Sequence, residues 1–423
     1  MSSSVVTSTP LVENRARIIG IDIARLLAIF GMMAAHLVTT TQQLPVTGEF
    51  LVSGTPSSTF ALLGGIGAVL STERYRRVAE PAAARRALVG RGLVLIVIGL
   101  ILASFSTLIA VVLPAYGLSL ILLACIIHLR THWLLGLTVV LTLLGAPFNS
   151  WLTELAASTP ALSEPDGLGE YVSSFFIPGV YPTMTWLTYM LLGVLIARML
   201  LHARRSGALR RRALQMALIG GLISAAATAL HLFAYSTIAV PVFERYGLAS
   251  NAFMSGFGTP MLPGIDGLLL GGPHSGTVLD IARTAGFAVL MLGLLIAATA
   301  ALVRVPRPLR ILQSAGAASL TIYSLHVIVT SITTANLTDL NSIAIGYPGF
   351  ALHVTGALVL GLVLAVLHRR GPLEAFSSGV AKALAGVLVQ EKIEALAAGP
   401  RSSVATQPAT GARSDVDDQR SSE

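Results

Sequence analysis

Apolar residues follow one another in long stretches through most of this 423-residue chain, with short polar segments between them. A bilayer core about 30 Å thick is crossed by about 20 residues of helix. The pattern therefore predicts an all-α integral membrane protein, a polytopic bundle of about ten transmembrane helices. The predicted spans cover approximately residues 18–40, 51–72, 87–105, 107–128, 132–149, 181–202, 212–235, 279–303, 311–333 and 346–368. Because only a few residues separate the third span from the fourth, we expect these two to form a tight hairpin.

Positive charges occupy every second connection between the predicted spans. Arginines gather in these connections and after the last span: Arg74, Arg76, Arg77, Arg85, Arg86, Arg91, Arg130, Arg204, Arg205, Arg210, Arg211, Arg212, Arg304, Arg307, Arg310, Arg369 and Arg370. The other connections, 41–50, 150–180, 236–278 and 334–345, carry almost none, with Arg245 as the exception. Since cytoplasmic loops are enriched in Lys and Arg, both termini are predicted to be cytoplasmic. This distribution accounts for the net charge of +8 without a nucleic-acid partner.

The two ends of the chain differ from the membrane domain, which we assign to residues 17–370. Residues 1–16 and 399–423 are polar, so we expect a disordered leader and a disordered tail. In the cytoplasmic segment 371–398, apolar residues recur at helical spacing over 374–396, which predicts an amphipathic helix on the inner leaflet. The first span is long and lacks a small-residue cleavage site, so we expect it to be retained as an anchor.

Three ionisable residues lie inside the first predicted span: Asp22, Arg25 and His36. Such side chains are costly in a bilayer, so their presence indicates a role. Asp22 and Arg25 are i,i+3 neighbours and are expected to form an ion pair, and Arg25 could also bind an anionic group of a substrate or acyl donor. Eleven residues, close to three helical turns, separate Arg25 from His36, so both project from one face about 16 Å apart. The alternative for His36 is an interfacial histidine at a helix end.

A second polar set forms a stripe on the ninth predicted span. Ser319, Tyr323, His326 and Thr330 occupy positions i, i+4, i+7 and i+11 of an otherwise apolar helix. The stripe belongs either to a functional site or to a polar seam between helices. The roles of other histidines are open, except that four at predicted cytoplasmic span ends are expected to be interfacial: His128, His132, His202 and His368.

The connection 236–278 is rich in Gly and Pro and yet apolar, which predicts an ordered cap or a partly re-entrant segment over the bundle. Asp266 and His274 lie in it. They are either solvated loop groups or a carboxylate that orients an imidazole. In the second span, the small residues of Gly64-Gly-Ile-Gly67 are expected to allow close helix packing rather than to bind phosphate.

The pattern Arg17-x4-Asp22-x2-Arg25-x5-Gly31-Met32-x3-His36 resembles the first-helix signature of the polytopic membrane acyltransferases. It is most similar to the bacterial branch related to heparan-alpha-glucosaminide N-acetyltransferase, although Leu26 follows Arg25 where the signature commonly has Gly. Three further segments resemble that branch: Pro273-His-Ser-Gly276, Ser319-Leu-Thr-Ile-Tyr323 and Gly371-Pro-Leu-Glu374. The resemblance implies transfer of an acyl group, usually acetyl from cytoplasmic acetyl-CoA, to a hydroxyl or amine of a glycan or lipid across the membrane. It also implies that His36 is the catalytic histidine and that Asp22 and Arg25 are the first-helix pair.

The chemistry of acyl transfer agrees with these residue types. A base near the acceptor is required, and histidine suits that task near neutral pH, with His326 and His274 as further candidates. Tyr323, Ser319 or backbone amides of the Gly-rich segments could stabilise the tetrahedral intermediate. The single cysteine, Cys125, excludes an internal disulfide and a cysteine-based metal site, and no metal is expected.

The partners expected of such an enzyme are the bilayer of the plasma membrane and an envelope saccharide or glycolipid, and the sequence allows a homodimer. The alternative is a secondary transporter or glycolipid translocator in which Asp22, Arg25 and the histidines couple protons or bind substrate. Transporters often contain inverted repeats and paired broken helices, and the sequence contains one Gly/Pro-rich segment without a counterpart in the other half. This difference favours the enzyme.

Overall fold

The computed structural model describes residues 18–39, 44–106, 109–158, 181–249, 251–302, 304–335 and 345–398. Within these ranges, every regular element is a helix. Several sequence predictions concern residues outside them: the leader and tail, Arg17, most of the connection 150–180 and nearly all of the connection 334–345.

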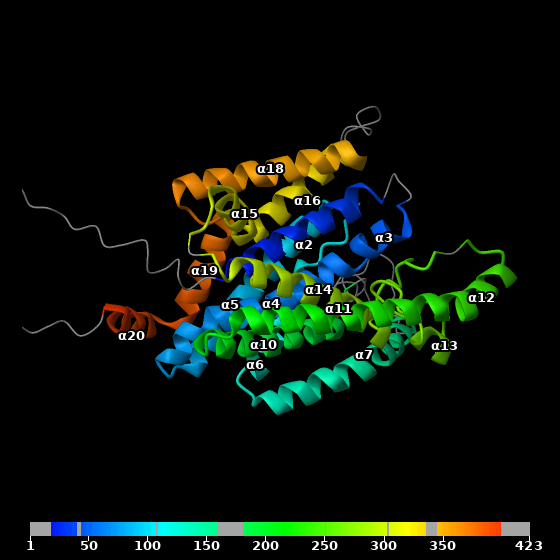
Figure 1. The fold of residues 1–423 in the computed structure, drawn as a ribbon, viewed down its shortest axis with the longest axis horizontal. Coiled ribbons are helices and arrows are strands. Elements are labelled where there is room, and N and C mark those ends of the chain that lie inside the picture. Colours follow the sequence, from blue (N-terminus) through cyan, green and yellow to red (C-terminus); the bar gives the residue numbers. More distant parts are fainter. Residues whose placement is uncertain are drawn as a thin grey trace, which may run out of the picture.

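Helices cover each of the ten predicted spans. They are α2 (Ile19–Leu37), α4 (Thr55–Arg77), α5 (Pro81–Ala103), α6 (Leu113–Ile126), α7 (Thr131–Ser158), α10 (Thr183–Arg205), α11 (Leu209–Ala234), α14 (Val278–Thr299), α15 (Arg307–Ala317) with α16 (Ser319–Ala335), and α18 (Gly346–Leu367). Figure 1 shows the long helices side by side, with α7 and α18 on opposite sides of the bundle. Among the described residues, seven helices are long and apolar enough to cross a membrane, or up to nine if each of two bent pairs is one span. The predicted all-α membrane fold is confirmed.

The outer helices expose apolar side chains, as lipid-facing helices do. Trp133 on α7, Leu218 and Phe233 on α11 and Val366 on α18 are between 64% and 68% exposed. Exposed apolar area on this scale is rare on proteins that face water. These faces therefore fit hydrocarbon, whereas α2, α10 and α14 bury more than half of their most apolar window.

The two ends of the bundle differ in charge. The turns that carry the arginine clusters lie at one end, which we call the arginine end, together with α19 (Pro372–Ala385) and α20 (Val387–Ala398) at the left of Figure 1. The opposite end, called the loop end, carries α3 (Val46–Val52), α12 (Val240–Arg245) and α13 (Gly264–Leu268). This separation is the one that the alternating arginines predict.

Helices α5 and α6 pack against each other as the predicted hairpin, although their connection, residues 104–112, is longer than the few residues predicted. Their backbones touch at Gly92 and Gly117, where a Cβ on either residue would lie 2.5–2.6 Å from the carbonyl oxygen of the other. Helix α6 is shorter than the predicted span 107–128, since it begins at Leu113 and ends at Ile126. A similarly close approach joins α4 to α10, because a Cβ at Gly65 would overlap the carbonyl of Met190. Close packing is the role predicted for the glycines of the second span.

The ninth span is broken, which corrects the prediction of one continuous helix over 311–333. Helices α15 and α16 meet at Ala318 with a bend of 71°. The exposed N–H groups at the start of α16 are satisfied from elsewhere in the chain, because the Glu374 carboxylate accepts bonds from Leu320 N (2.6 Å) and Thr321 N (3.1 Å). The Thr321 hydroxyl donates to the same carboxylate at 2.6 Å. The free N–H groups and the dipole at the start of a helix favour a nearby carboxylate, so Glu374 stabilises the break by capping α16.

The predicted amphipathic helix over 374–396 is also two helices, α19 and α20, which bend by 103°. The bend lies at Gly386, whose φ of 102° is accessible to glycine. Helix α19 lies across the arginine end, where Ala381 and Ala385 pack against Tyr75 and the start of α5. Its apolar side chains Phe376 and Leu384 remain exposed.

At the loop end, helix continues past the predicted end of the seventh span. Helix α11 runs through a π-helical turn, η1 (Tyr235–Ala239), into α12, so that residues 236–245 are helical rather than part of the loop. The remainder, up to Thr277, is anchored on the bundle by His231. This buried imidazole accepts a hydrogen bond from Gly271 N (2.9 Å) and donates to the carbonyl of Ala252 (2.7 Å). His231 therefore has a structural role.

Candidate functional site

Two histidines from distant parts of the chain meet inside the bundle. His36, in the last turn of α2, and His326, in α16, lie with Nδ1 of His36 3.1 Å from Nε2 of His326. Their rings are nearly parallel, with centroids 5.4 Å apart. His326 is buried. The structure thus joins the titratable group of the first span to the polar stripe of the ninth.

The contact continues through Thr330 to a third histidine on α18. The Thr330 hydroxyl lies 3.4 Å from Nδ1 of His326 and 3.5 Å from Nε2 of His353. Nδ1 of His353 lies 2.8 Å from the carbonyl oxygen of Gly349. The rings of His326 and His353 meet edge to face at 4.8 Å. We call His36, His326, Thr330 and His353 the histidine chain.

The carbonyl at the end fixes the direction of every bond in the histidine chain when the rings are neutral, as apolar surroundings favour. A carbonyl only accepts, so His353 Nδ1 must donate to Gly349, and Nε2 of His353 must accept from the Thr330 hydroxyl. The Thr330 oxygen then accepts from His326 Nδ1, and His326 Nε2 accepts from His36 Nδ1. The basic lone pair of His36 is therefore on Nε2. A neutral imidazole accepts a proton at this nitrogen.

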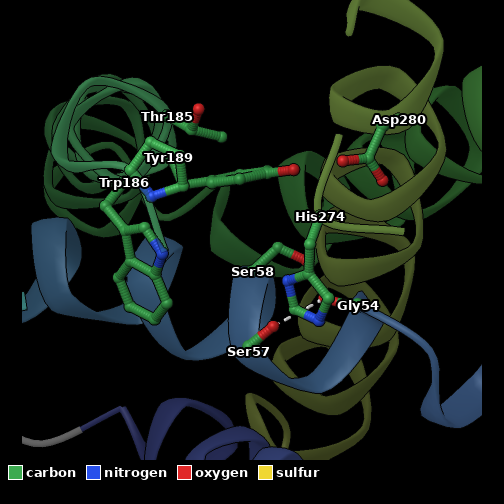
Figure 2. Close-up of a pocket in the computed structure, with 9 residues that line it drawn as sticks. Gly54, Ser57, Ser58, Thr185, Trp186, Tyr189, His274 and Asp280 are labelled. Atoms are coloured by element: carbon green, nitrogen blue, oxygen red, sulfur yellow. Dashed lines mark hydrogen bonds between the residues drawn. The ribbon is translucent and has the colours of Figure 1, made fainter. Parts of the chain in front are cut away.

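His274 lines a small cavity beside the histidine chain. The cavity measures about 20 Å³, room for roughly one water-sized group, and aromatic, hydroxyl and carboxylate side chains surround it. Figure 2 shows the Tyr189 hydroxyl and the Asp280 carboxylate directed toward each other across it, with His274 and Trp186 below. Its walls come from the start of α4, the start of α10, the loop before α14 and α14 itself.

An ion pair lies directly behind this cavity. Arg283 Nη2 donates to Asp280 Oδ1 at 3.1 Å, and both side chains are buried. Asp280 also accepts from Gly276 N, which ties the loop to α14. The Arg283 guanidinium lies 5.8 Å from the centroid of the Phe50 ring and 5.5 Å from that of the Phe253 ring. Two of its nitrogens, Nε and Nη1, are buried without a hydrogen-bond partner in the described part of the chain.

The loop residues of this region are held in their neutral forms. Burial, and then the positive charge of Arg283, lower the pKa of His274 to about 4. Burial raises the pKa of Tyr181, whose ring meets His274 edge to face at 5.3 Å, to about 12. A neutral imidazole and a neutral phenol can accept or donate a hydrogen bond near pH 7.

The predicted ion pair of the first helix is present near the arginine end. Arg25 Nη1 donates to Asp22 Oδ1 at 2.9 Å, and the amide of Gln313 on α15 lies 3.5 Å from the other oxygen. The Arg25 guanidinium packs against Gly67 of α4. Arg74 near the end of α4 and Arg91 in the first half of α5 lie in the same half of the bundle as Arg25. We call Arg25, Arg74 and Arg91 the inner cluster.

The other sequence-predicted site residues lie in different places. Tyr323 is buried one turn before His326, and its oxygen accepts from Val112 N at 3.3 Å, so its own proton remains able to donate. Ser319 is the first residue of α16, about 10 Å along the helix from His326. Asp266 is exposed in α13, whereas Asp280 is the carboxylate that shares a cavity with His274. The described residues contain no group of three or more His, Cys, Asp or Glu able to hold a metal.

Sequence reasoning did not identify Asp280 and Arg283. A signal was present, because Asp280-x-x-Arg283 repeats the spacing of Asp22-x-x-Arg25 inside another apolar span. Trp186 and Tyr189 gave no comparable signal, since aromatic residues are common in the cores of membrane helices.

Residues 17–221 match the sequence model of a family described as heparan-alpha-glucosaminide N-acetyltransferase, catalytic. The matched region runs from α2 into α11, and it contains Asp22, Arg25 and His36. No match is found among curated proteins. The chain is therefore related to this family of membrane-bound acyltransferases, and the helices make it a multi-pass membrane protein.

Proposed function

We propose that this protein transfers an acetyl group from a cytoplasmic coenzyme A thioester to a hydroxyl or amine of a glycan or glycolipid on the other side of the plasma membrane. The observation that carries the proposal is the histidine chain, which directs the basic nitrogen of His36 away from His326. The histidine chain lies toward the loop end, opposite the arginine clusters. A base at that end and cations at the other suit a donor and an acceptor that arrive from opposite sides.

The cluster of Arg25, Arg74 and Arg91 supports the donor side. Arginine binds phosphate by paired hydrogen bonds, and coenzyme A carries several phosphates. Nε of Arg74 is buried without a hydrogen-bond partner among the described residues, so it retains a donor for a ligand. Arg25 and His36 are eleven residues apart on α2, about 16 Å along the axis, which an extended pantetheine arm can bridge. The thioester would then lie beside His36.

The proposed step is a direct acyl transfer. Nε2 of His36 accepts the proton of the acceptor hydroxyl or amine while the acceptor oxygen or nitrogen bonds to the thioester carbonyl carbon. The resulting oxyanion requires a hydrogen-bond donor, a role open to the Tyr323 hydroxyl. When the intermediate collapses, the carbon–sulfur bond breaks and the proton on His36 passes to the thiolate. The products are the acetylated acceptor and free coenzyme A, and His36 returns to its starting state.

The cavity beside His274 supports the acceptor side. It admits about one water-sized group, which suits the reacting hydroxyl or amine rather than a whole sugar ring. The Asp280 carboxylate and the Tyr189 hydroxyl can bind such a group, and the indole of Trp186 supplies the kind of apolar face on which sugar rings pack. A polar acceptor is thereby favoured over an apolar one.

The test uses the purified full-length protein in detergent with acetyl-CoA and a soluble alkyl glucosaminide, following release of the coenzyme A thiol. A general base contributes typically 10²–10⁴-fold in rate, so His36→Ala should lower kcat by about that range with the fold retained. His326→Ala should cause a smaller loss, because His326 acts through His36. His368→Ala is the matched control, since His368 is exposed at the arginine end.

Two results would contradict the assignment of His36. One is a parental rate for His36→Ala, while His326→Ala or His274→Ala abolishes transfer. The other is failure of the parent protein to consume acetyl-CoA with any polar acceptor, which would favour the transporter interpretation.

A further inference from the structure

A cleft of about 310 Å³ opens at the arginine end, far from the histidine chain. Its walls are the last turns of α4, the last turns of α10 and the residues that follow α6. Six of its lining residues are ionisable: Glu73, Arg76, His128, Arg198, His202 and Arg205.

Positive charge in this cleft exceeds negative charge. Glu73 is the one carboxylate in the lining, and it is shared. Arg76 binds it through Nε and Nη2 at 2.7 Å each, Arg205 binds it at 3.1 Å, and Arg77 approaches to 3.8 Å. One carboxylate cannot neutralise three guanidinium groups. The remaining positive charge attracts an anion.

Arg198 adds a further cation that is fixed in place. Its Nη2 donates to the carbonyl oxygens of Ile127 (2.8 Å) and Leu129 (2.9 Å), and its Nη1 donates to the Thr131 hydroxyl (3.0 Å). These bonds involve neutral acceptors, so the charge of Arg198 is not compensated by them. They also hold a flexible side chain in one position, which reduces the entropy lost when a ligand binds.

The positive charge around the cleft also affects the pKa of His128. Burial, and then the charges of Arg85 and Arg198, lower the pKa of this imidazole at the end of α6. The lining also includes the apolar side chains of Val69, Ile127 and Leu201. A ligand suited to this lining carries a compact negative group next to a less polar part.

We propose that this cleft binds a phosphate group. Phosphate oxygens match the fork of donors on arginine, and two or more guanidiniums around one anion are the usual arrangement in phosphate sites. The phosphate can come from a soluble phosphate compound or from the headgroup of an anionic lipid, since the arginine end is predicted to lie at the cytoplasmic surface.

This site goes beyond the proposed acetyl transfer. Ser58 lines the cavity near His274 and Glu73 lines the cleft, and fifteen residues of α4 separate them, about 22 Å along the helix. Arg74 of the inner cluster places its guanidinium over the ring of Tyr75, 4.6 Å from the centroid, and does not line the cleft. Binding at the cleft can therefore be measured without turnover, and its failure would leave the proposed reaction untouched.

The experiment has two arms on the full-length protein. Inorganic pyrophosphate binding is measured by calorimetry in a neutral detergent. Phosphatidylglycerol retention is measured by native mass spectrometry after release from nanodiscs of equal parts phosphatidylglycerol and phosphatidylcholine. Arg205→Gln should weaken binding about tenfold, because it removes a charge-assisted contact from an exposed position. Glu73→Gln should strengthen binding, because it removes the carboxylate.

Arg211→Gln is the matched control, since Arg211 is an exposed arginine of α11 that does not line the cleft. Binding of pyrophosphate alone supports a soluble ligand, and selective retention of phosphatidylglycerol supports a lipid. The proposal is overturned if the parent binds neither probe. It is also overturned if Arg205→Gln and Glu73→Gln, both folded by their unfolding temperatures, bind like Arg211→Gln.

Discussion

Replacement of Thr330 by valine tests the direction of the histidine chain. Valine has nearly the shape of threonine and lacks the hydroxyl that links His326 to His353. Without it, Nδ1–H of His326 loses its acceptor and Nε2 of His353 loses its donor. His326 is then no longer held in the tautomer that accepts from His36, and His36 is no longer held with its basic lone pair on Nε2.

The geometry sets the size of the effect. The two contacts measure 3.4 and 3.5 Å, at the long end of hydrogen-bond distances, so each is worth about 0.5–1 kcal/mol. Their loss should destabilise the productive tautomer by about 1–2 kcal/mol. Because 1.4 kcal/mol corresponds to a factor of ten in rate, kcat should fall about tenfold. KM for acetyl-CoA should change little, since Thr330 lies far from the arginine cluster.

The assay compares kcat and KM for three variants of α16. Thr333→Val is the matched control, because within the described ranges the Thr333 hydroxyl bonds only to carbonyl oxygens of its own helix, at 2.8 and 3.0 Å. Thr330→Ser, which keeps the hydroxyl, should restore most of the rate. Nitrogen NMR of labelled histidines supplies a second measurement, since the valine variant should shift the tautomer signals of His326 and His36.

Two outcomes would refute this reasoning. If Thr330→Val and Thr333→Val have the same kcat, the link through Thr330 does not orient the base. If Thr330→Val lowers kcat by more than a thousandfold while the fold is intact, Thr330 contacts the reacting groups directly, which the long bonds do not predict.

Two further predictions concern the ends of the bundle. The pKa of His274 is lowered to about 4, against an ordinary value near 6.5. The neutral imidazole therefore contributes its full stability above pH 6.5, and this contribution is lost as the pH falls toward 4. Unfolding temperatures measured between pH 6.5 and pH 4 should fall less steeply in His274→Gln than in the parent protein. Glu374→Ala removes the cap of α16 and should lower the free energy of unfolding in detergent titrations by about 1–2 kcal/mol, whereas Glu391→Ala on the exposed face of α20 should have little effect.

Helix positions could be predicted from the sequence because a membrane span needs about 20 apolar residues and must satisfy its own backbone hydrogen bonds, which a helix does. The breaks could not be predicted in the same way. The bend at Ala318 depends on Glu374, which lies 56 residues later in the chain, and only the fold brings the carboxylate to the start of α16. Helix α11 extends into the predicted loop through the π-helical turn η1, which ends just before Pro241 and lets the helix accommodate the missing N–H of that residue.

Part of the candidate site could be predicted, because an ionisable side chain inside a membrane span costs free energy and therefore indicates a role. His36 and His326 stand out because an ionisable or polar residue inside an apolar span needs a partner, and each provides one for the other. Asp266 did not lie beside His274, since nearness in sequence within a loop does not fix side-chain direction. The carboxylate at that cavity is Asp280, which a helix start places there.

The same sequence spacing, Asp-x-x-Arg, occurs at both ends of the bundle. Asp22 and Asp280 each lie in the first turn of a helix, where the helix dipole favours a carboxylate, and each binds the arginine one turn later. Gly20 at the start of α2 packs against Leu295 and Ile296 near the end of α14. The two helices are therefore in contact and run in opposite directions. The same four-residue spacing therefore places one guanidinium at the arginine end and the other at the loop end. In the proposed reaction the first guanidinium serves the donor, whereas His36, in the last turn of α2, lies at the same end as Asp280 and Arg283, where the acceptor would bind.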